Sequence, residues 1–394
     1  MSICDSKMSS SSYPSTVHDW MQAIRRPVPY RVGNARLHVK TRTVAYGMLF
    51  MSAILILVLY ILPTQYIQRN CPDIYPVLHD FNYPFTSPIT NESGVHYKIA
   101  VVTDLDTDSK SKTDKNTWLS YLLHGTLSIS TDQRHVAVSF DLEPKTLKST
   151  WSHGGRGMEL SELVVFNGKL YTVDDRTGVV YEIIDNKVIP WVILTDGDGN
   201  SQKGFKSEWA TVKNGKLYVG GLGKEWTTQT GEVVNLNPQW IKSISATGQI
   251  AHHDWHTNYN AMRKATGYGL PGYMIHESSV WSDIHKRWFF LPRRAARTKY
   301  DDKIDERRAT NMMIIANDKF DDIEIRYIGV KNEVRGFSSF KFIPGTNDQM
   351  IVALKSEEVD GNVASYILVF TVKGDIVLHD TKIGDFKFEG IEFI

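Results

Sequence analysis

Cysteine is almost missing from this chain of 394 residues, which contains only Cys4 and Cys71. The two thiols lie on opposite sides of an apolar segment that we interpret below as a membrane span, so they cannot pair within one chain. Residues 96–394 contain no cysteine, which excludes a disulfide-stabilised scaffold and requires a hydrophobic core. About 300 residues are enough, because a chain of that size buries about 75% of its unfolded surface. Cys71 therefore either remains a free thiol or links two chains in a homodimer.

An excess of charge of one sign is also missing, since the formal net charge is +1. The balance hides an asymmetry: residues 1–43 carry seven basic and two acidic side chains, and the remaining residues carry 38 basic and 42 acidic ones. A mildly acidic body argues against nucleic acid as a partner, because nucleic-acid binding requires a basic surface.

Two common catalytic motifs and most helical periodicity are absent. The chain contains no Walker A sequence and no Gly-x-Ser-x-Gly nucleophile elbow. We expect one short helix over residues 258–265. Short β-branched and aromatic runs bounded by turn residues recur instead, at 98–103, 136–140, 217–220, 288–291, 350–354 and 366–372. The sequence therefore predicts an all-β fold.

Residues 44–62 form an uncharged apolar segment that ends before Pro63 and has the length of a transmembrane helix. Because 43 residues precede it, an uncleaved signal anchor is favoured over a signal peptide, and a buried soluble helix is the alternative. Basic residues crowd its N-terminal flank, so the positive-inside rule places the N-terminus in the cytosol and predicts a type II membrane protein.

This orientation defines four expected regions of the chain. We expect a disordered cytoplasmic tail over 1–43, the transmembrane signal-anchor helix over 44–62, a proline-rich lumenal stem over 63–95, and one folded domain over 96–394. The sequon Asn91-Glu92-Ser93 falls on the lumenal side, as N-glycosylation of Asn91 requires.

A charged hairpin is predicted over residues 155–178. Asn167-Gly168 is a strong signal for a type I′ turn, because both of its central residues need positive φ. The turn joins the β-prone runs 163–166 and 170–173 and brings the charges at their outer ends to one sheet edge. Those charges are Arg156, Glu159, Glu162, Asp174, Asp175 and Arg176. They indicate either a site or a solvated hairpin end.

An internal repeat predicts a propeller. The sequence Asn-Gly-Lys-Leu-Tyr occurs at 167–171 and again at 214–218, with an acidic residue before each copy. Periods near 50 residues in an all-β chain are typical of propeller blades, each of which begins at the central channel. The repeat selects five channel positions, one per expected blade: Glu162, Glu208, Glu277, Ser338 and Glu389. A β-sandwich with coincidental similarity is the alternative.

Several carboxylates facing one another across a channel require a cation, because like charges at close range raise one another's pKa. Ligands that are all oxygen suit Ca²⁺ better than Zn²⁺, which favours cysteine and histidine. The repeat therefore predicts a central Ca²⁺ site.

The body resembles the calcium-activated nucleotidase (apyrase) family over essentially all of residues 96–394. The resemblance is carried by long specific stretches at 100–107, 155–162, 173–178, 220–228, 287–294, 336–344 and 389–394. It implies a five-bladed β-propeller with Ca²⁺ in its central tunnel. The implied calcium ligands are Ser161, Glu162, Glu208, Glu277, Ser338 and Glu389, and the implied catalytic carboxylates are Asp104 and Asp175. Glu162 stands where a close relative has Asp, which preserves the charge and alters the local geometry.

The implied reaction is hydrolysis of a terminal phosphate from nucleoside di- and triphosphates. UDP and GDP in the Golgi or endoplasmic reticulum are the substrates that the resemblance suggests. Arg156, Arg176 and Arg293 can make bidentate contacts to phosphate, and Trp226, beside Lys224, can stack on the base. Each of these residues has an equally simple structural interpretation, in blade-to-blade ion pairs or in blade packing.

Two other functional classes remain open for this sequence. One is a non-enzymatic propeller that binds a partner and uses Ca²⁺ only for stability. The other is a propeller lactonase or phosphotriesterase, which also uses tunnel Ca²⁺. The sequence leaves open whether the stem is cleaved to release a secreted form.

Overall fold

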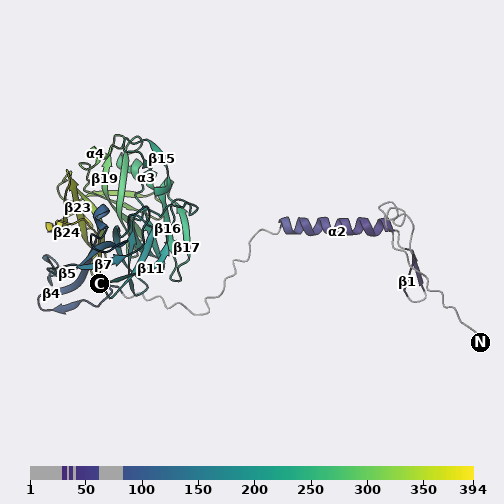
Figure 1. Ribbon diagram of the computed structural model, residues 1–394, viewed down its shortest axis with the longest axis horizontal. Helices are drawn as coiled ribbons and strands as arrows, with labels where there is room; N and C mark the ends of the chain where they lie inside the picture. The colour runs from purple at the N-terminus through teal and green to yellow at the C-terminus, as the bar shows by residue number, and fades with distance from the viewer. Residues whose placement is uncertain (1–28, 33–34, 39–40, 62–82) are drawn as a thin grey trace, which may run out of the picture. The chain divides into compact units, whose positions relative to one another are not determined.

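The structure is a computed structural model that describes residues 29–32, 35–38, 41–61 and 83–394 (Figure 1). It divides into two compact units, Met1–Val77 and Leu78–Ile394. Cys4 and Cys71 lie outside the described residues, as do most of the predicted tail and stem.

The described part of the first unit contains a strand pair and one helix. Strands β1 (Pro29–Val32) and β2 (Ala35–His38) pair antiparallel within the segment predicted as a disordered tail. Helix α2 (Thr41–Ile61) covers almost all of the predicted membrane span. Among the residues that the structure describes, no helix is both long and apolar enough to cross a membrane.

The second unit is a five-bladed β-propeller, as the repeat and the resemblance predicted. Each blade is a four-stranded antiparallel path. The innermost strands are β8 (Leu160–Phe166), β12 (Trp209–Lys213), β18 (Tyr273–Ser282), β22 (Arg335–Phe342) and β26 (Phe388–Phe393). These five strands contact one another in a closed ring, from β8 through β12, β18 and β22 to β26 and back to β8. The β-sandwich alternative is wrong.

The outer strands of the blades follow in chain order. The first blade adds β9 (Lys169–Asp174), β10 (Val179–Ile184) and β11 (Lys187–Ile193); the second adds β13 (Lys216–Gly220), β16 (Trp240–Ile244) and β17 (Ile250–Asp254). The third adds β19 (Arg287–Ala296), β20 (Met312–Ala316) and β21 (Ile323–Tyr327); the fourth adds β23 (Met350–Val359), β24 (Asn362–Thr371) and β25 (Ile376–Gly384).

The fifth blade closes the propeller by joining the two ends of the second unit. Its innermost strand, β26, is the last strand of the chain, and it pairs with β4 (Gly94–Thr103), followed by β5 (Trp118–Ile129) and β6 (Val136–Phe140) (Figure 1). Strands β3 (Ile89–Asn91) and β7 (Lys145–Ser149) pair with β4 and β5. Phe85 N–H also donates to Phe393 O at 3.2 Å. The folded unit thus begins before residue 96, the predicted boundary.

Smaller elements connect the blades. They are the 3₁₀ turns η1 (Asp106–Ser109) and η2 (Asn237–Gln239), the strand pair β14 (Trp226–Thr227) and β15 (Val233–Asn235), and the helices α3 (His256–Thr266) and α4 (Asp302–Asp305). Helix α3 confirms the short helix predicted over 258–265 and ends at Gly267, whose φ of 76° suits a glycine cap.

The two predicted hairpin turns are confirmed by their backbone angles. Asn167 and Gly168 have φ of 50° and 69°, and Asn214 and Gly215 have φ of 51° and 68°. Both turns therefore have the positive φ pair of a type I′ turn, whose twist matches the flanking strands.

Hydrophobic clusters fill the spaces between neighbouring blades. Ala100 and Val102 of the fifth blade pack with Leu160 and Leu163 of the first, and corresponding clusters join every other neighbouring pair around the ring. Burying each valine, leucine, isoleucine or phenylalanine side chain of these clusters contributes roughly 1.5–3 kcal/mol. The stability of the propeller therefore comes mainly from packing between blades.

Candidate active site at one end of the propeller channel

Bulges in the innermost strands mark the predicted ligand positions. The pairing register of β8, β18, β22 and β26 shifts at Ser161, Glu277, Ser338 and Glu389, respectively. A bulge inserts an unpaired residue and re-aims its side chain, and such bulges concentrate next to active sites. In the remaining blade, Glu208 directly precedes β12, and its N–H donates to Gly220 O at 2.8 Å. Each blade thus brings one predicted oxygen ligand to the same end of the channel.

The carboxylates of this ring raise one another's pKa values. Burial, together with Glu277 and Asp175, raises the pKa of Glu208 to about 8 although Lys206 lowers it. Burial raises the pKa of Glu389 well above its ordinary value, and Glu277 adds to the shift. The ring therefore holds more negative charge than its buried surroundings favour, which is the condition that a bound cation relieves.

Three basic side chains neutralise the ring in this structure. Arg293, which is 2% exposed, bonds to Glu277 and Glu358 and lies 2.8 Å from Glu389 Oε1. Lys387 Nζ lies 3.4 Å from Glu389 Oε1, and Lys206 Nζ lies 2.9 Å from Glu208 Oε1.

The two predicted catalytic aspartates lie beside this ring. Asp104 follows β4 and accepts a hydrogen bond from Lys387 Nζ at 2.6 Å, while Asp175 follows β9 and pairs with Lys206. Burial, and to a smaller extent the charges of Asp175 and Asp106, raises the pKa of Asp104 to about 7, although Lys387 opposes the shift. The two carboxylates therefore lie close enough for the charge of Asp175 to raise the pKa of Asp104.

Four buried polar atoms of the predicted site residues have no hydrogen-bond partner among the described residues. They are Ser161 Oγ, Asp175 Oδ1, Arg176 Nε and Arg293 Nε. Burying a polar group without a hydrogen-bond partner costs free energy. Several such groups at one place therefore indicate that a ligand binds there. The predicted ligands offer only hydroxyl and carboxylate oxygens, which suits calcium. The residues present therefore fit the cation that the sequence predicted.

Glu162 lies apart from the other predicted ligands. Its carboxylate accepts hydrogen bonds from Ser339 Oγ at 2.8 and 3.1 Å and from Leu163 N–H at 2.9 Å. Lys341 Nζ lies 3.2 Å from its Oε1. Burial raises the pKa of Glu162 to about 7 against the effect of Lys341 and Ser339. The structure thus brings Ser161 to the bulge and directs the side chain of Glu162 to a second cluster.

The predicted phosphate-binding arginines differ in their surroundings. Arg156 is held by Glu159, with bonds of 2.6 and 2.5 Å, and by Asp106 at 3.2 Å. Arg293 is enclosed by three carboxylates. Arg176 makes no ion pair with any described residue, which leaves its guanidinium available to an incoming anion.

The predicted base-binding residues lie in a different environment. Lys224 donates to Glu225 O at 2.9 Å and to Thr227 Oγ1 at 2.8 Å, and its amine lies over the Tyr300 ring. Trp226 carries Lys203 over its ring at 4.0 Å. No hydrogen bond or ion pair within the described part of the chain joins either residue to the acidic ring. We interpret the contacts of Lys224 and Trp226 as structural ones that stabilise β14.

A second set of acidic side chains could also hold a metal ion. Oxygens of Asp104, Asp106 and Glu159 lie within 4.8 Å of one another. Arg156 and Lys387 already neutralise this set.

Three residues of the site are missing from the sequence prediction: Lys206, Lys387 and Glu358. A sequence pattern could have identified the two lysines, because each stands two residues before its ring carboxylate, as Lys206-x-Glu208 and Lys387-x-Glu389. Glu358 follows no such spacing, because it reaches Arg293 from the second strand of another blade.

The fold and the site together define a β-propeller with a buried acidic centre at one end of its channel. The apyrase family model matches residues 105–394. The chain therefore belongs to the apyrase family, whose members hydrolyse nucleotide phosphates.

Individual relatives are similar over most of the chain. The chain is 54% identical over 312 residues to the soluble calcium-activated nucleotidase 1 of Rattus norvegicus, which covers 79% of this chain and 77% of that protein. It is 44% identical over 370 residues to an apyrase of Cimex lectularius, covering 93% and 99%. It is 48% identical over 307 residues to the apyrase apy-1 of Caenorhabditis elegans, covering 77% and 86%.

Proposed function

We propose that this protein hydrolyses the terminal phosphate of nucleoside diphosphates in a calcium-dependent reaction, with UDP and GDP as preferred substrates and triphosphates as variable ones. The observation that carries the proposal is the set of five blades that each bring a predicted oxygen ligand to one channel end, beside Asp104 and Asp175. The printed name of the rat relative, a calcium-activated nucleotidase, supports the same cation.

The chain's own residues supply positioning and proton transfer. Phosphoryl transfer requires charge neutralisation and an oriented nucleophile more than covalent chemistry. Asp175, whose Oδ1 has no partner, or Asp104 positions the attacking water and accepts its proton. Arg176 contacts the phosphate with its free guanidinium. Bound calcium would polarise phosphate oxygens.

The electrostatic balance of the ring explains how substrate and cation can share the site. Lys206, Arg293 and Lys387 pair with the ring carboxylates. Glu208, Glu277 and Glu389 would hold a calcium ion. Lys206, Arg293 and Lys387, which lie against the same carboxylates, would supply positive charge to the phosphate oxygens.

We also propose a location for this reaction. The segment 44–62 would anchor the chain as a type II protein in the Golgi or endoplasmic reticulum membrane, with the propeller in the lumen. Asn91 is exposed and at the end of β3, which is compatible with glycosylation. Cleavage of the stem would yield a secreted form, and Cys71 would link a homodimer.

Phosphate release from UDP, GDP and ADP tests the proposal on the full chain. We expect release in calcium, its loss on chelation and little recovery in magnesium. Full activity in magnesium alone would contradict the calcium assignment. Hydrolysis of lactones or phosphotriesters without nucleotide hydrolysis would select the propeller esterase class, and no hydrolysis would select a binding module.

A further inference from the structure

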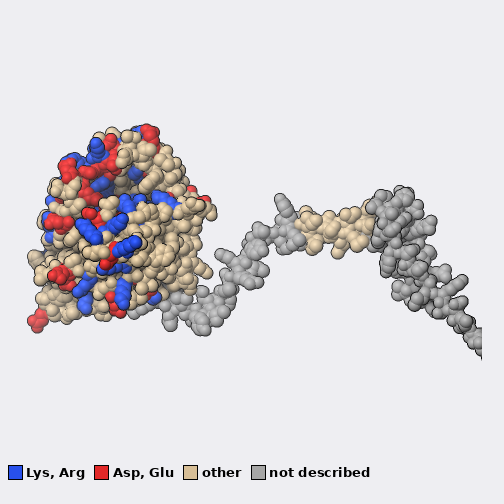
Figure 2. All heavy atoms as spheres, viewed as in Figure 1, with Lys and Arg blue, Asp and Glu red and all other residues tan. Residues whose placement is uncertain are grey.

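A cavity further along the propeller channel than the acidic ring combines apolar and polar walls. Figure 2 shows basic and acidic side chains interspersed over one face of the second unit, so that face presents mixed charge and no extended patch of one sign. The cavity is more selective, because its walls come from the later residues of the innermost strands. Its volume is about 410 Å³, and its lining contains none of the predicted calcium or catalytic residues.

One part of the lining is apolar. It comes from Val164 and Phe166 of β8, Val280 and Trp281 of β18, and Phe342 of β22. The volume lies near the lower end of the range of about 300–1,000 Å³ that is typical of small-molecule pockets. The cavity therefore suits a molecule with a single ring better than an oligomer.

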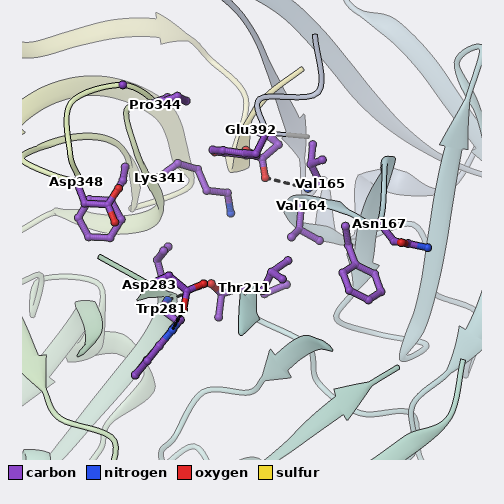
Figure 3. A pocket seen from close by; sticks show the side chains of 17 residues that line it. Val164, Val165, Asn167, Thr211, Trp281, Asp283, Lys341, Pro344, Asp348 and Glu392 are labelled. Atoms are coloured by element: carbon purple, nitrogen blue, oxygen red, sulfur yellow. Dashed lines mark hydrogen bonds between the residues drawn. The ribbon is translucent and has the colours of Figure 1, made fainter. Parts of the chain in front are cut away.

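Lys341 of β22 supplies unused hydrogen-bond donors. Figure 3 shows its amine pointing into the open space between Glu392, Val164 and Thr211. The residue is 5% exposed, and Nζ has no hydrogen-bond partner among the described residues. Its charge is balanced by Glu162, whose Oε1 lies 3.2 Å away. An ammonium group has several donors, of which a bond to Glu162 can use one, so the others favour an uncharged acceptor oxygen.

Asp348 supplies acceptor oxygens on the same lining. Its carboxylate accepts a hydrogen bond from Ser282 Oγ at 2.7 Å and forms no ion pair with any described residue. A carboxylate can accept about four hydrogen bonds. Asp348 therefore retains capacity for the O–H donors of a ligand.

The potential inside the cavity is negative. Asp283, Asp348 and Glu392 line it together with the single lysine. Burial, followed by the charges of Glu392 and Asp348, raises the pKa of the Tyr83 phenol well above its ordinary value. An anion such as a nucleotide would meet these carboxylates and is therefore excluded.

The buried ammonium disfavours the two other simple kinds of ligand. A cation would lie beside Lys341 and leave its donors unused, and a purely apolar molecule would leave both Lys341 and Asp348 without ligand partners. A neutral ligand with hydroxyl groups fits both side chains, because a hydroxyl can donate to a carboxylate and accept from an ammonium group.

We propose that this cavity binds one neutral pyranose sugar. Hydroxyl oxygens of the sugar would accept hydrogen bonds from Lys341 Nζ, and hydroxyl groups would donate to Asp348. The C–H groups of the ring would pack against Val164, Val280 and Trp281. The site is separate from the nucleotide site at the acidic ring.

Ligand-observed saturation-transfer NMR on the full chain tests this proposal. The probes are the methyl pyranosides of glucose, galactose and mannose, each paired with the uronate in which a carboxylate replaces the hydroxymethyl group. At least one neutral glycoside should bind, and its uronate should bind about tenfold or more weakly, because the added charge faces Asp348 and Glu392. Lys341→Met should weaken binding of the glycoside about tenfold or more, while the exposed control Lys187→Met should retain it.

A second variant keeps the test decisive if Lys341→Met does not fold. Asp348→Asn removes one negative charge, keeps an acceptor for Ser282 and tolerates the φ of 54° at this position. It should tighten uronate binding several-fold and change binding of the neutral glycoside by about twofold or less. The proposal would be overturned if none of the three glycosides binds, if a uronate binds as tightly as its glycoside, if folded Lys341→Met binds normally, or if UDP displaces the glycoside.

Discussion

Asp104 and Asp175 occupy the same position in two neighbouring blades. Each follows the second strand of its blade, and each donates its backbone N–H to the residue before the innermost strand, Asp104 to Lys387 O at 3.0 Å and Asp175 to Glu159 O at 2.9 Å. Each carboxylate pairs with a lysine that also pairs with a ring carboxylate, Glu389 or Glu208. Each aspartate is therefore coupled to the ring through one lysine, Asp104 within its own blade and Asp175 through the next blade.

Asp175→Asn should reduce kcat by about 100-fold or more while KM changes little, because the amide cannot accept a proton from water. Phosphate-release kinetics and a thermal melt measure the two effects separately. Asp185→Asn, at an exposed turn residue with φ of 48°, is the matched control. Near-normal turnover of Asp175→Asn would remove this residue from the catalytic set.

The pH dependence of kcat/KM should depend on Asp104. Its pKa is raised to about 7 by burial, so activity that requires the ionised form rises as pH increases through that value, or through a lower one when calcium is bound nearby. Lys387 stabilises the ionised form, and Lys387→Met should therefore move the midpoint to higher pH. Profiles of both proteins check the shift, with the exposed Lys382→Met as the control. A midpoint that stays in place or falls in Lys387→Met would contradict this role of Asp104.

Glu162→Gln should alter calcium activation less than Glu277→Gln. The carboxylate of Glu162 is held by Ser339 and lies near Lys341, whereas Glu277 pairs with Arg293 in the ring. Loss of a direct charged ligand should raise the calcium concentration for half-maximal activity by about tenfold or more. Equal shifts in the two variants would show that Glu162 turns toward the ion when calcium binds.

Arg293→Met should destabilise the calcium-free protein by about 3–5 kcal/mol, because it leaves Glu277, Glu358 and Glu389 without their buried partner. Calcium should restore part of this loss, since a ligand that binds only the folded state adds stability. Denaturant unfolding with chelator and with calcium measures both quantities. A calcium increment no larger than that of the unmodified protein would argue against a cation in this ring.

Ile391→Ala should lower the free energy of unfolding by about 2–5 kcal/mol. Ile391 is fully buried in the strand that closes the ring and packs between the fourth and fifth blades. Val330→Ala, at a side chain that is 92% exposed, should change stability by about 0.5 kcal/mol or less. A similar small effect at Ile391 would mean that the closing strand contributes little to the core.

Local interactions made much of this fold predictable. The Asn167-Gly168 and Asn214-Gly215 turns depend on the φ preferences of two residues each, and the short alternating strands depend on side-chain periodicity. The repeat of an acidic or serine anchor at the start of each blade located Glu208, Glu277, Ser338 and Glu389 correctly on or beside the innermost strands. These features are readable because neighbouring residues in the sequence determine them.

The remaining features depend on contacts between distant residues. Pairing of β26 with β4 joins strands from the two ends of the domain, and no local pattern specifies such a partner. Arg293 meets Glu358 only because two blades pack together. Adjacent residues on a strand point to opposite faces, and a bulge changes which one faces the channel. Ser161 and Glu162 were therefore equivalent candidates in the sequence, and only the tertiary structure showed that the Glu162 carboxylate is held by Ser339 and Lys341.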